Sequence, residues 1–252
     1  MEISLKNKNI LVTGASRGIG KAIAEETGKS GARVAVHYGK NKAEAEKIAK
    51  EIGNNSQAFG ADLEKPEECK NLFEKVVKDF RRIDVLVNNA GVAILSPLDG
   101  DKWVEAWDRT MAINLRSVGI LARLAIQHFR KIGGGKIINI ASRAAYRGDT
   151  AEYLAYAASK GGVVSLSKSI ARDFGKDNIV CFALAPGWVR TDMAKEAMDQ
   201  DEYGEEFVMQ GIALNRLTEP RDIAPIAALL ASGLADHATG TTIDINAASY
   251  VH

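Results

Sequence analysis

Short runs of apolar and β-branched residues alternate with longer amphipathic stretches from the start of the chain. The first strand is expected at Asn9 to Thr13 and the first helix at Gly18 to Ser30, followed by a strand at Arg33 to His37 and a helix at Asn41 to Ile52. Apolar residues that recur with a period near two in one segment and near 3.6 in the next are typical of β-α units. The pattern therefore predicts a parallel sheet covered by helices.

The same alternation continues into the second half of the chain. The further elements expected are a strand at Gln57 to Gly60, a helix opened by Pro66, a strand at Ile83 to Val87, a long helix from about Asp101 to Lys131, a strand at Lys136 to Ala141, a helix at Tyr153 to Phe174 and a strand at Ile179 to Ala183. With five prolines, no repeat and no low-complexity segment, residues 1–252 are expected to form one doubly wound α/β domain.

The stretch from Trp188 to Gly211 interrupts this pattern. It shows neither a clean strand nor a long core helix, and it carries five acidic residues: Asp199, Asp201, Glu202, Glu205 and Glu206. Open α/β sheets bind ligands outside the carboxyl ends of their strands, which is where this stretch is expected. It is therefore a candidate lid, with a solvated pair of surface helices as the equally open alternative.

Composition narrows the class of partners. Hydrophobic residues make up 46% of the chain, and 33 basic residues against 32 acidic ones leave a formal charge of +1. This balance favours neither nucleic acid nor a membrane as partner. No apolar run is long enough to span a bilayer, and two distant cysteines without a signal-like leader predict a cytoplasmic protein. Four scattered histidines lack metal-ligand spacing, so no metal site is expected.

The first strand runs directly into the sequence TGASRGIG at residues 13–20, and a helix follows. Glycines let the backbone turn tightly and come close to a pyrophosphate, while the helix N-terminus offers unpaired N–H groups to an anion. The spacing is one residue longer than the usual dinucleotide fingerprint, and an ordinary strand-to-helix turn uses glycine as well. The segment is a candidate phosphate loop.

Tyr156 and Lys160 lie four residues apart in an expected helix, so they share one face of it. A nearby ammonium favours the phenolate, which would lower the pKa of the tyrosine from about 10 toward the range useful for general acid–base catalysis. Tyr153 lacks a lysine at the matching offset and is the weaker candidate. Ser142 follows a strand at the expected ligand edge, where its hydroxyl could bond a substrate oxygen. Each feature also has a purely structural interpretation, as a helix-surface pair and a turn serine.

Together these motifs resemble the short-chain dehydrogenase/reductase family, and the resemblance covers nearly the whole chain. Further motifs follow in the family's order: NNAG at residues 88–91, Asn114 in a helix, and Pro186-Gly187 followed by Thr191. The resemblance implies a Rossmann-type fold and an NAD(P)-dependent oxidoreductase that acts on CH–OH or C=O groups. It also implies a homotetramer in which the two long helices pair across a two-fold axis, unless the lid and loops cover their surplus apolar positions.

The resemblance also assigns residues. Four match the family's catalytic tetrad: Asn114, Ser142, Tyr156 and Lys160. The residues implied as cofactor contacts are Gly14, Ser16, Arg17, Gly18, Ile19, Gly20, Tyr38, Lys40, Asp62, Leu63, Asn89, Ala90, Gly91, Tyr156, Lys160, Pro186, Gly187, Val189 and Thr191. Among them, Asp62 would contact the adenine, Asn89 would stabilise the central strand beside the cofactor, and Thr191 would hold the nicotinamide carboxamide.

In the implied mechanism the substrate carbonyl sits between Ser142 and Tyr156, takes a hydride from the nicotinamide and receives a proton from the tyrosine. Lys160 would lower the pKa of Tyr156 and bond the nicotinamide ribose, while Asn114 would hold a water that relays protons. Two departures from the family pattern stand out. Fourteen rather than thirteen steps separate Ser142 from Tyr156, which implies one extra residue in a loop that borders the substrate. Phe182 and Ala247 occupy positions where asparagine and glycine are common, and we expect local repacking there.

The second strand ends without the acidic residue that NAD enzymes place near the adenosine ribose. A carboxylate there would repel a 2′-phosphate, so its absence permits NADP. Arg17 and Lys40 are the candidate phosphate ligands, unless both are merely solvated loop charges. The sequence therefore predicts NADPH as the cofactor, with NADH less favoured.

The substrate class stays open between a 3-oxoacyl thioester on acyl carrier protein and a free alcohol, sugar or steroid. Carrier protein is acidic, so its reductase should be basic beside the cleft. Arg130, Lys131 and Lys176 are candidates for such a surface, but Asp177 and the acidic stretch at 188–211 oppose it. A dinucleotide-binding sensor without activity is the alternative from another class, and turnover of any ketone with NADPH would exclude it.

Overall fold

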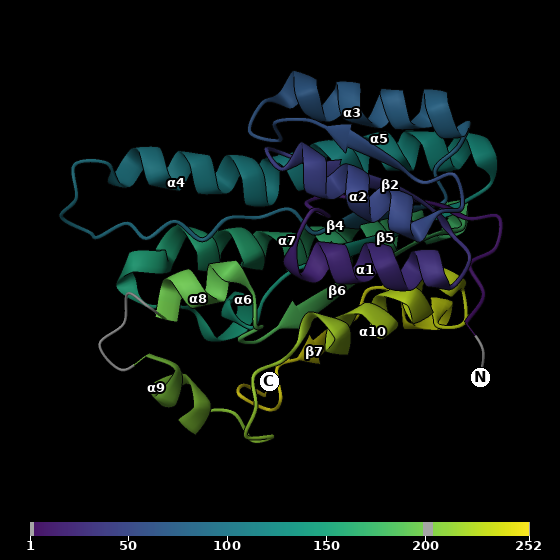
Figure 1. The fold of residues 1–252 in the computed structure, drawn as a ribbon. Coiled ribbons are helices and arrows are strands. Elements are labelled where there is room, and N and C mark those ends of the chain that lie inside the picture. Colours follow the sequence, from purple (N-terminus) through teal and green to yellow (C-terminus); the bar gives the residue numbers. More distant parts are fainter. Residues whose placement is uncertain (1–2, 199–203, 252) are drawn as a thin grey trace.

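The sheet sets the architecture of the computed structural model, which describes residues 3–198 and 204–251 (Figure 1). Within these residues seven strands lie in the order β3-β2-β1-β4-β5-β6-β7, and all neighbours are parallel. The strands are β1 (Asn9–Val12), β2 (Arg33–Tyr38), β3 (Gln57–Gly60), β4 (Val85–Asn88), β5 (Gly135–Ile140), β6 (Ile179–Pro186) and β7 (Thr242–Ile245). The α-helices are α1 (Gly18–Lys29), α2 (Lys42–Ile52), α3 (Pro66–Phe80), α4 (Trp103–Met111), α5 (Ser117–Ile132), α6 (Ala144–Arg147), α7 (Leu154–Phe174), α8 (Asp192–Met198), α9 (Gly204–Gln210) and α10 (Pro220–Ser232).

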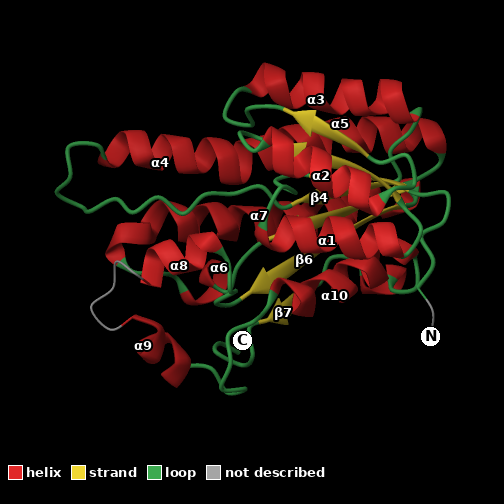
Figure 2. Cartoon of the chain, in the orientation of Figure 1, coloured by secondary structure: helices red, strands yellow, loops and turns green. Residues whose placement is uncertain are grey.

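Helices cover both faces of the sheet (Figure 2). On one face α1, α2 and α10 contribute buried residues such as Ile23 and Ala227 to a core with the strands. On the other face α3, α5 and α7 contribute Leu121 and Ile170 to a second core. Because both faces are buried, the central strands are almost wholly apolar, as a parallel sheet requires.

The strand order reverses between β1 and β4, which are neighbours in the sheet although two β-α units separate them in the chain. The first half of the chain winds toward β3 and the second half toward β7. Loops that follow β1 and β4 therefore leave the same edge in opposite directions. The expected doubly wound Rossmann-type fold is confirmed, and its switch point is where such sheets bind ligands.

Several expected bounds differ from the structure by one or two residues, and two elements differ more. The long helix expected from Asp101 begins at Trp103 and contains a π-helical segment, Ala112–Arg116, between α4 and α5. The strand expected at Ile179 to Ala183 extends to Pro186, since β7 pairs with its last residues. One wide helical turn scarcely changes the apolar period, which is why the sequence pattern did not indicate it.

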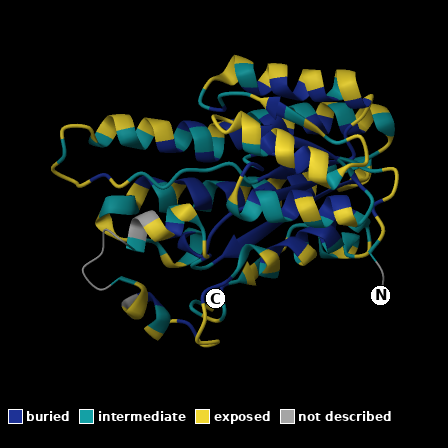
Figure 3. Ribbon diagram, viewed as in Figure 1, coloured by how far each residue is buried: buried dark blue, intermediate teal, exposed yellow. Residues whose placement is uncertain are grey.

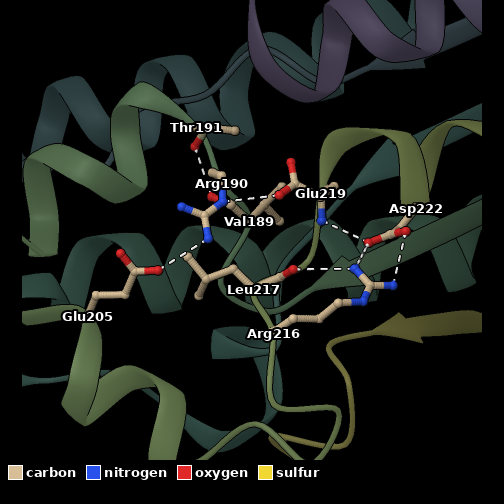
Figure 4. A network of polar contacts seen from close by, with 8 residues as sticks. All are labelled: Val189, Arg190, Thr191, Glu205, Arg216, Leu217, Glu219 and Asp222. Atoms are coloured by element: carbon tan, nitrogen blue, oxygen red, sulfur yellow. Dashed lines mark hydrogen bonds and ion pairs between the residues drawn. The ribbon is translucent and has the colours of Figure 1, made fainter.

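The 188–211 segment contains two seven-residue helices, α8 and α9, as its lack of a clean pattern suggested. Asp199, Asp201 and Glu202 lie outside the described residues. Figure 4 shows how the base of the segment is held: the Arg190 guanidinium donates to Glu219 at 3.0 Å and to Glu205 of α9 at 3.2 Å. Backbone bonds between Arg190 and Thr218 and between Thr218 and Trp188 reinforce this attachment. The segment is thus tied to the start of α10.

The two unusual residues noted in the sequence occupy different environments. Phe182 is completely buried in β6. Its ring belongs to the core between the sheet and the helices α1, α2 and α10. Ala247 has φ +51°, in the left-handed region that favours glycine. Among the described residues, no helix is both long and apolar enough to cross a membrane, and no group of three metal-ligating side chains occurs.

Candidate active site

A cleft of about 2180 Å³ runs along the carboxyl edge of the sheet. The loops after β1, β2, β3, β4, β5 and β6 all border it, as does the 188–211 segment through Met193 and Val208. The strand order places the loops after β2 and β3 at one end of this edge and those after β5 and β6 toward the other. Residues of the sequence motifs therefore meet in one cleft, although Gly14 and Thr191 are 177 positions apart in the chain.

The glycine-rich loop is held by the NNAG segment that follows β4. The amide of Asn89 donates to the carbonyl oxygens of Thr13 and Gly14 at 2.8 and 3.1 Å, and the Thr13 hydroxyl accepts the N–H groups of Asn89 and Ala90. Gly14 has φ +62°, and a Cβ there would lie 2.9 Å from the Ala90 Cα. The loop therefore requires glycine both for its conformation and for its close approach to the next strand.

The start of α1 is open to an anion. Arg17 is the N-cap residue and its side chain does not cap the helix, so the N–H groups of the first turn have no side-chain partner. Gly18 and Ile19 of that turn line the cleft. A backbone cradle with this dipole suits a pyrophosphate, and the residues present therefore fit a dinucleotide.

His37 joins two walls of the cleft, a role that the sequence reading missed. Its Nδ1 accepts the Gly14 N–H at 3.0 Å, and its Nε2 lies 3.1 Å from the Ala61 oxygen, to which the neutral ring donates. The ring thus connects the glycine loop to the loop that carries Asp62. Burial lowers the pKa of His37 to about 4, because a charged imidazole would lose its hydration there.

The end of the cleft beside the loop after β2 carries more charge than the sequence indicated. Lys40 lines it, but so does Glu44, whose carboxylate accepts from Lys21 at 3.0 Å. The Arg17 guanidinium donates to Asp192 of α8 at 3.1 Å, and both side chains are exposed. Arg17 therefore lies between the glycine loop and the 188–211 segment.

Most of the expected cofactor contacts border the cleft, but Tyr38 and Gly20 are not among its lining residues. The Tyr38 ring packs against Gly60 of β3, where a Cβ would come within 2.8 Å of the ring. Gly20 packs against Asn89 inside the loop. Thr191 does line the cleft, and its hydroxyl accepts the Ala194 N–H at 3.3 Å. The individual cofactor contacts stay predictions.

Ser142, Tyr156 and Lys160 meet at the end of β5. The Lys160 ammonium donates to the Ile140 carbonyl oxygen at 2.8 Å and lies 5.7 Å from the centre of the Tyr156 ring. Lys160 is only 5% exposed, and burial lowers its pKa to about 8. The Ser142 hydroxyl accepts the Ala144 N–H at 3.1 Å and hydrogen-bonds to Tyr156.

The expectation that Lys160 lowers the pKa of Tyr156 is wrong for this structure. Burial raises the pKa of Tyr156 above its usual value, and the hydrogen bond to Ser142 only partly opposes that shift. The physical reason is that removing the phenol from water disfavours the charged phenolate, and the Lys160 ammonium, which donates to the Ile140 carbonyl oxygen, does not offset that cost. The phenol is consequently protonated at neutral pH and can donate a proton.

Asn114 lies in the π-helical segment and is almost fully buried. Its amide donates to the Val92 oxygen at 2.8 Å and to Ser159 at 3.2 Å, while its Oδ1 accepts the Val92 N–H at 2.8 Å. Both amide hydrogens are in use, so any water held by this side chain would have to donate to Oδ1. The side chain's observed role is to hold the chain after Gly91 beside the cleft.

Comparison with known proteins agrees with this geometry. A family model described as enoyl-(acyl carrier protein) reductase matches residues 14–247. The 3-oxoacyl-(acyl-carrier-protein) reductase of Staphylococcus epidermidis is 37% identical over 97% of this chain and 100% of its own length. The chain belongs to the short-chain dehydrogenase/reductase family.

Solved structures of the family show how varied its substrates are. A candidate NAD(P)-dependent gluconate 5-dehydrogenase from Beutenbergia cavernae, with NADP bound at low occupancy, has a TM-score of 0.90, 32% identity and 98% coverage of both chains. An NADPH-dependent 3-quinuclidinone reductase from Rhodotorula rubra has a TM-score of 0.90, 28% identity and coverage of 98% of this chain and 93% of its own. Membership of the short-chain dehydrogenase/reductase family thus makes this protein an oxidoreductase without deciding its substrate.

His37 gives a pH prediction. Because its pKa is about 4 when folded and about 6.5 when unfolded, the unfolded chain binds the additional proton between these values. The contribution of His37 to the free energy of unfolding should therefore be fully present above about pH 6.5. It should fall by up to about 3 kcal/mol as the pH drops toward 4. Urea titrations from pH 4.5 to 7.5 should show a smaller pH dependence for His37→Asn, which keeps an acceptor for Gly14.

Exposed His237 supplies the matched control. His237→Gln removes an exposed histidine and therefore controls for the loss of a histidine as such. Parallel curves for wild type and His37→Asn would show that the ring does not gain a proton on unfolding.

Proposed function

We propose that this family member is an NADPH-dependent carbonyl reductase, with Tyr156 as the proton donor. The observation that carries the proposal is the meeting of two hydroxyls and one buried ammonium at the end of β5, in a cleft whose other walls form a phosphate loop. When bound, the nicotinamide would supply the hydride. Ser142 and Tyr156 would bind and polarise the carbonyl oxygen, which receives the tyrosine's proton.

The remaining tetrad residues would act by positioning. Lys160 is fixed by the Ile140 carbonyl oxygen beside the tyrosine ring, where its ammonium would bind and orient the nicotinamide ribose. Asn114 holds the backbone at Val92 and contacts Ser159 on α7, the helix that carries both Tyr156 and Lys160. These contacts align α7 with the loop after β4.

The substrate is less easily assigned to a carrier-protein thioester. Arg130, Lys131 and Lys176 lie before β5 and β6, at the sheet edge opposite the cleft, because α5 and α7 run back from the site to the start of the next strand. Within one chain they cannot form a basic surface beside the cleft entrance. These residues therefore do not favour a carrier-protein thioester over a free carbonyl compound, although the Staphylococcus epidermidis relative is a 3-oxoacyl-(acyl-carrier-protein) reductase.

An assembly of several copies is supported by apolar side chains that the fold leaves uncovered. Val104 of α4 is 63% exposed and Leu98, in the loop before it, is 58% exposed. Trp103 and Trp107 stack on the same helix with centroids 5.1 Å apart. In Figure 3 the helix α4 is coloured mainly exposed and intermediate. We infer a homotetramer that buries this surface.

Replacing the proton donor tests the mechanism. Tyr156→Phe keeps the ring and removes the hydroxyl, so kcat should fall by about 10² to 10⁴. The Kd for NADPH, measured by fluorescence titration, should change by less than about threefold. Tyr153→Phe is the control, and it should retain most of the activity. A Tyr156→Phe enzyme within a few-fold of wild type would refute the assignment.

Cofactor preference tests the ribose site. Wild type should favour NADPH over NADH by at least about tenfold in kcat/KM, since a hydrogen bond to a charged group contributes about 1.5 to 3 kcal/mol. Arg17→Ala should raise KM for NADPH and leave KM for NADH nearly unchanged. Asp192→Asn removes the competing partner of Arg17 and should not weaken NADPH binding. Equal use of NADPH and NADH by the wild type would overturn the proposed cofactor preference.

Light scattering tests the assembly. At micromolar concentration the particle mass should be about four times the chain mass. Val104→Glu should lower it, because a charge would be buried in the interface, whereas Ala43→Glu on the exposed face of α2 should not. A monomeric wild type would contradict the proposal.

A further inference from the structure

Arg143 is placed in the wall of the cleft, one residue beyond Ser142. Its backbone N–H donates to the Pro186 oxygen at 3.0 Å, which fixes the chain between the ends of β5 and β6. The residue is only 9% exposed, yet it lines the cleft. Its side chain thus belongs to the same enclosed region as the hydroxyl proposed to bind the carbonyl.

The guanidinium of Arg143 has no hydrogen-bond acceptor. Among residues 3–198 and 204–251 neither a hydrogen bond nor an ion pair reaches it, and its one contact of note is the Trp188 ring, 5.9 Å from the guanidinium carbon. Burial and the like charge of Arg147 lower its pKa to about 10, while Asp149 opposes this. The group therefore stays charged at neutral pH, and the described residues supply no acceptor for its five N–H donors.

Two other arginines near the cleft have carboxylate partners within the protein. Arg216 donates to both oxygens of Asp222, and Arg190 joins Glu205 to Glu219, although both guanidinium groups are more than half exposed (Figure 4). Arg143 is the more buried cation and lacks such partners. A buried charge without a partner is strongly unfavourable, so a role in ligand binding accounts for it better than a role in folding.

We propose that Arg143 binds an anionic oxygen group of the substrate, a carboxylate or a phosphate, and thereby selects oxo acids or phosphorylated ketones over neutral carbonyl compounds. The proposal rests on the carbonyl reductase function. Because Arg143 and Ser142 line the same cleft, one substrate could reach both side chains. The fork of the guanidinium fits two oxygens at once, and this contact selects the substrate without entering the proton transfer.

Arg147 lies one helical turn further on, at the end of α6, and also borders the cleft. It differs from Arg143 in being half-exposed and in having Asp149 as a partner at 3.8 Å. The charge of Arg147 adds to the positive potential of this wall, but Asp149 already serves as its ion-pair partner. It therefore supplies the matched control for a substitution of arginine.

The test compares each charged carbonyl compound with a neutral counterpart. The probes are acetoacetate, 4-oxopentanoate and 5-oxohexanoate with their methyl esters, and dihydroxyacetone phosphate with dihydroxyacetone. Wild type should prefer at least one acid over its ester, or the phosphate over the free ketone, by about tenfold or more in kcat/KM. Which of the two classes shows the preference identifies the anion.

Substitution then assigns the preference to one side chain. Arg143→Met should reduce kcat/KM for the preferred anion by about tenfold to hundredfold, mainly through KM, and alter the neutral counterpart by less than about threefold. Arg143→Lys should recover part of the loss, and Arg147→Gln should cost less than Arg143→Met. Turnover of neutral ketones without any preference for an anion would overturn the anion site while leaving the reductase function intact.

Two measurements on the protein without turnover make the result independent of activity. Calorimetric titration of the same anions should give a Kd that rises at least about tenfold in Arg143→Met, even if no carbonyl is reduced and the proposed function fails. The Tm of Arg143→Met should equal or exceed that of wild type, because an unpaired buried charge is removed. A clear fall in Tm would identify Arg143 as a structural residue and overturn the proposal.

Discussion

Every strand of the sheet points the same way, and this constraint organises the rest of the molecule. Parallel strands need a return helix between them, so the chain passes over one face or the other after each strand, and both faces become buried. The carboxyl ends of all strands meet at one edge. Since the winding direction reverses between β1 and β4, the loops after these two strands separate there and leave room for a ligand.

A network of buried polar side chains fixes the loops that border this opening. Thr13, Asn89 and His37 together hold the glycine loop from two sides, and each bond uses a backbone group that the sheet itself leaves unpaired at its edge. The network explains why polar side chains occupy positions among wholly apolar strands. A hydrogen bond lost here would leave a buried group unsatisfied and also move the loop.

Two buried cations give the other half of the cleft its chemical character. Lys160 has a protein acceptor, the Ile140 carbonyl, and is thereby fixed beside Tyr156. Arg143 has none among the described residues, although it is nearly as buried. The fold thus supplies a hydrogen-bond acceptor for Lys160, whereas we propose that a ligand supplies the acceptor for Arg143. The same wall of the cleft thus combines a tyrosine that stays protonated at neutral pH, the proposed proton donor, with the buried charge that we propose selects the substrate.

The sequence by itself determined the elements, their alternation and many of the residues that line the cleft, because apolar periodicity and glycine positions are local properties. β3 coincides with the expected strand, and α1 differs from its expected range by one residue. The tertiary structure alone decided the π-helical turn at Asn114, the bonds of His37, the direction of the Tyr156 pKa shift and the isolation of Arg143. Each of these depends on burial and on partners that lie far along the chain, such as Val92 for Asn114 and Ala61 for His37. Desolvation arises only when the elements pack together, and no pattern in the sequence carries its sign.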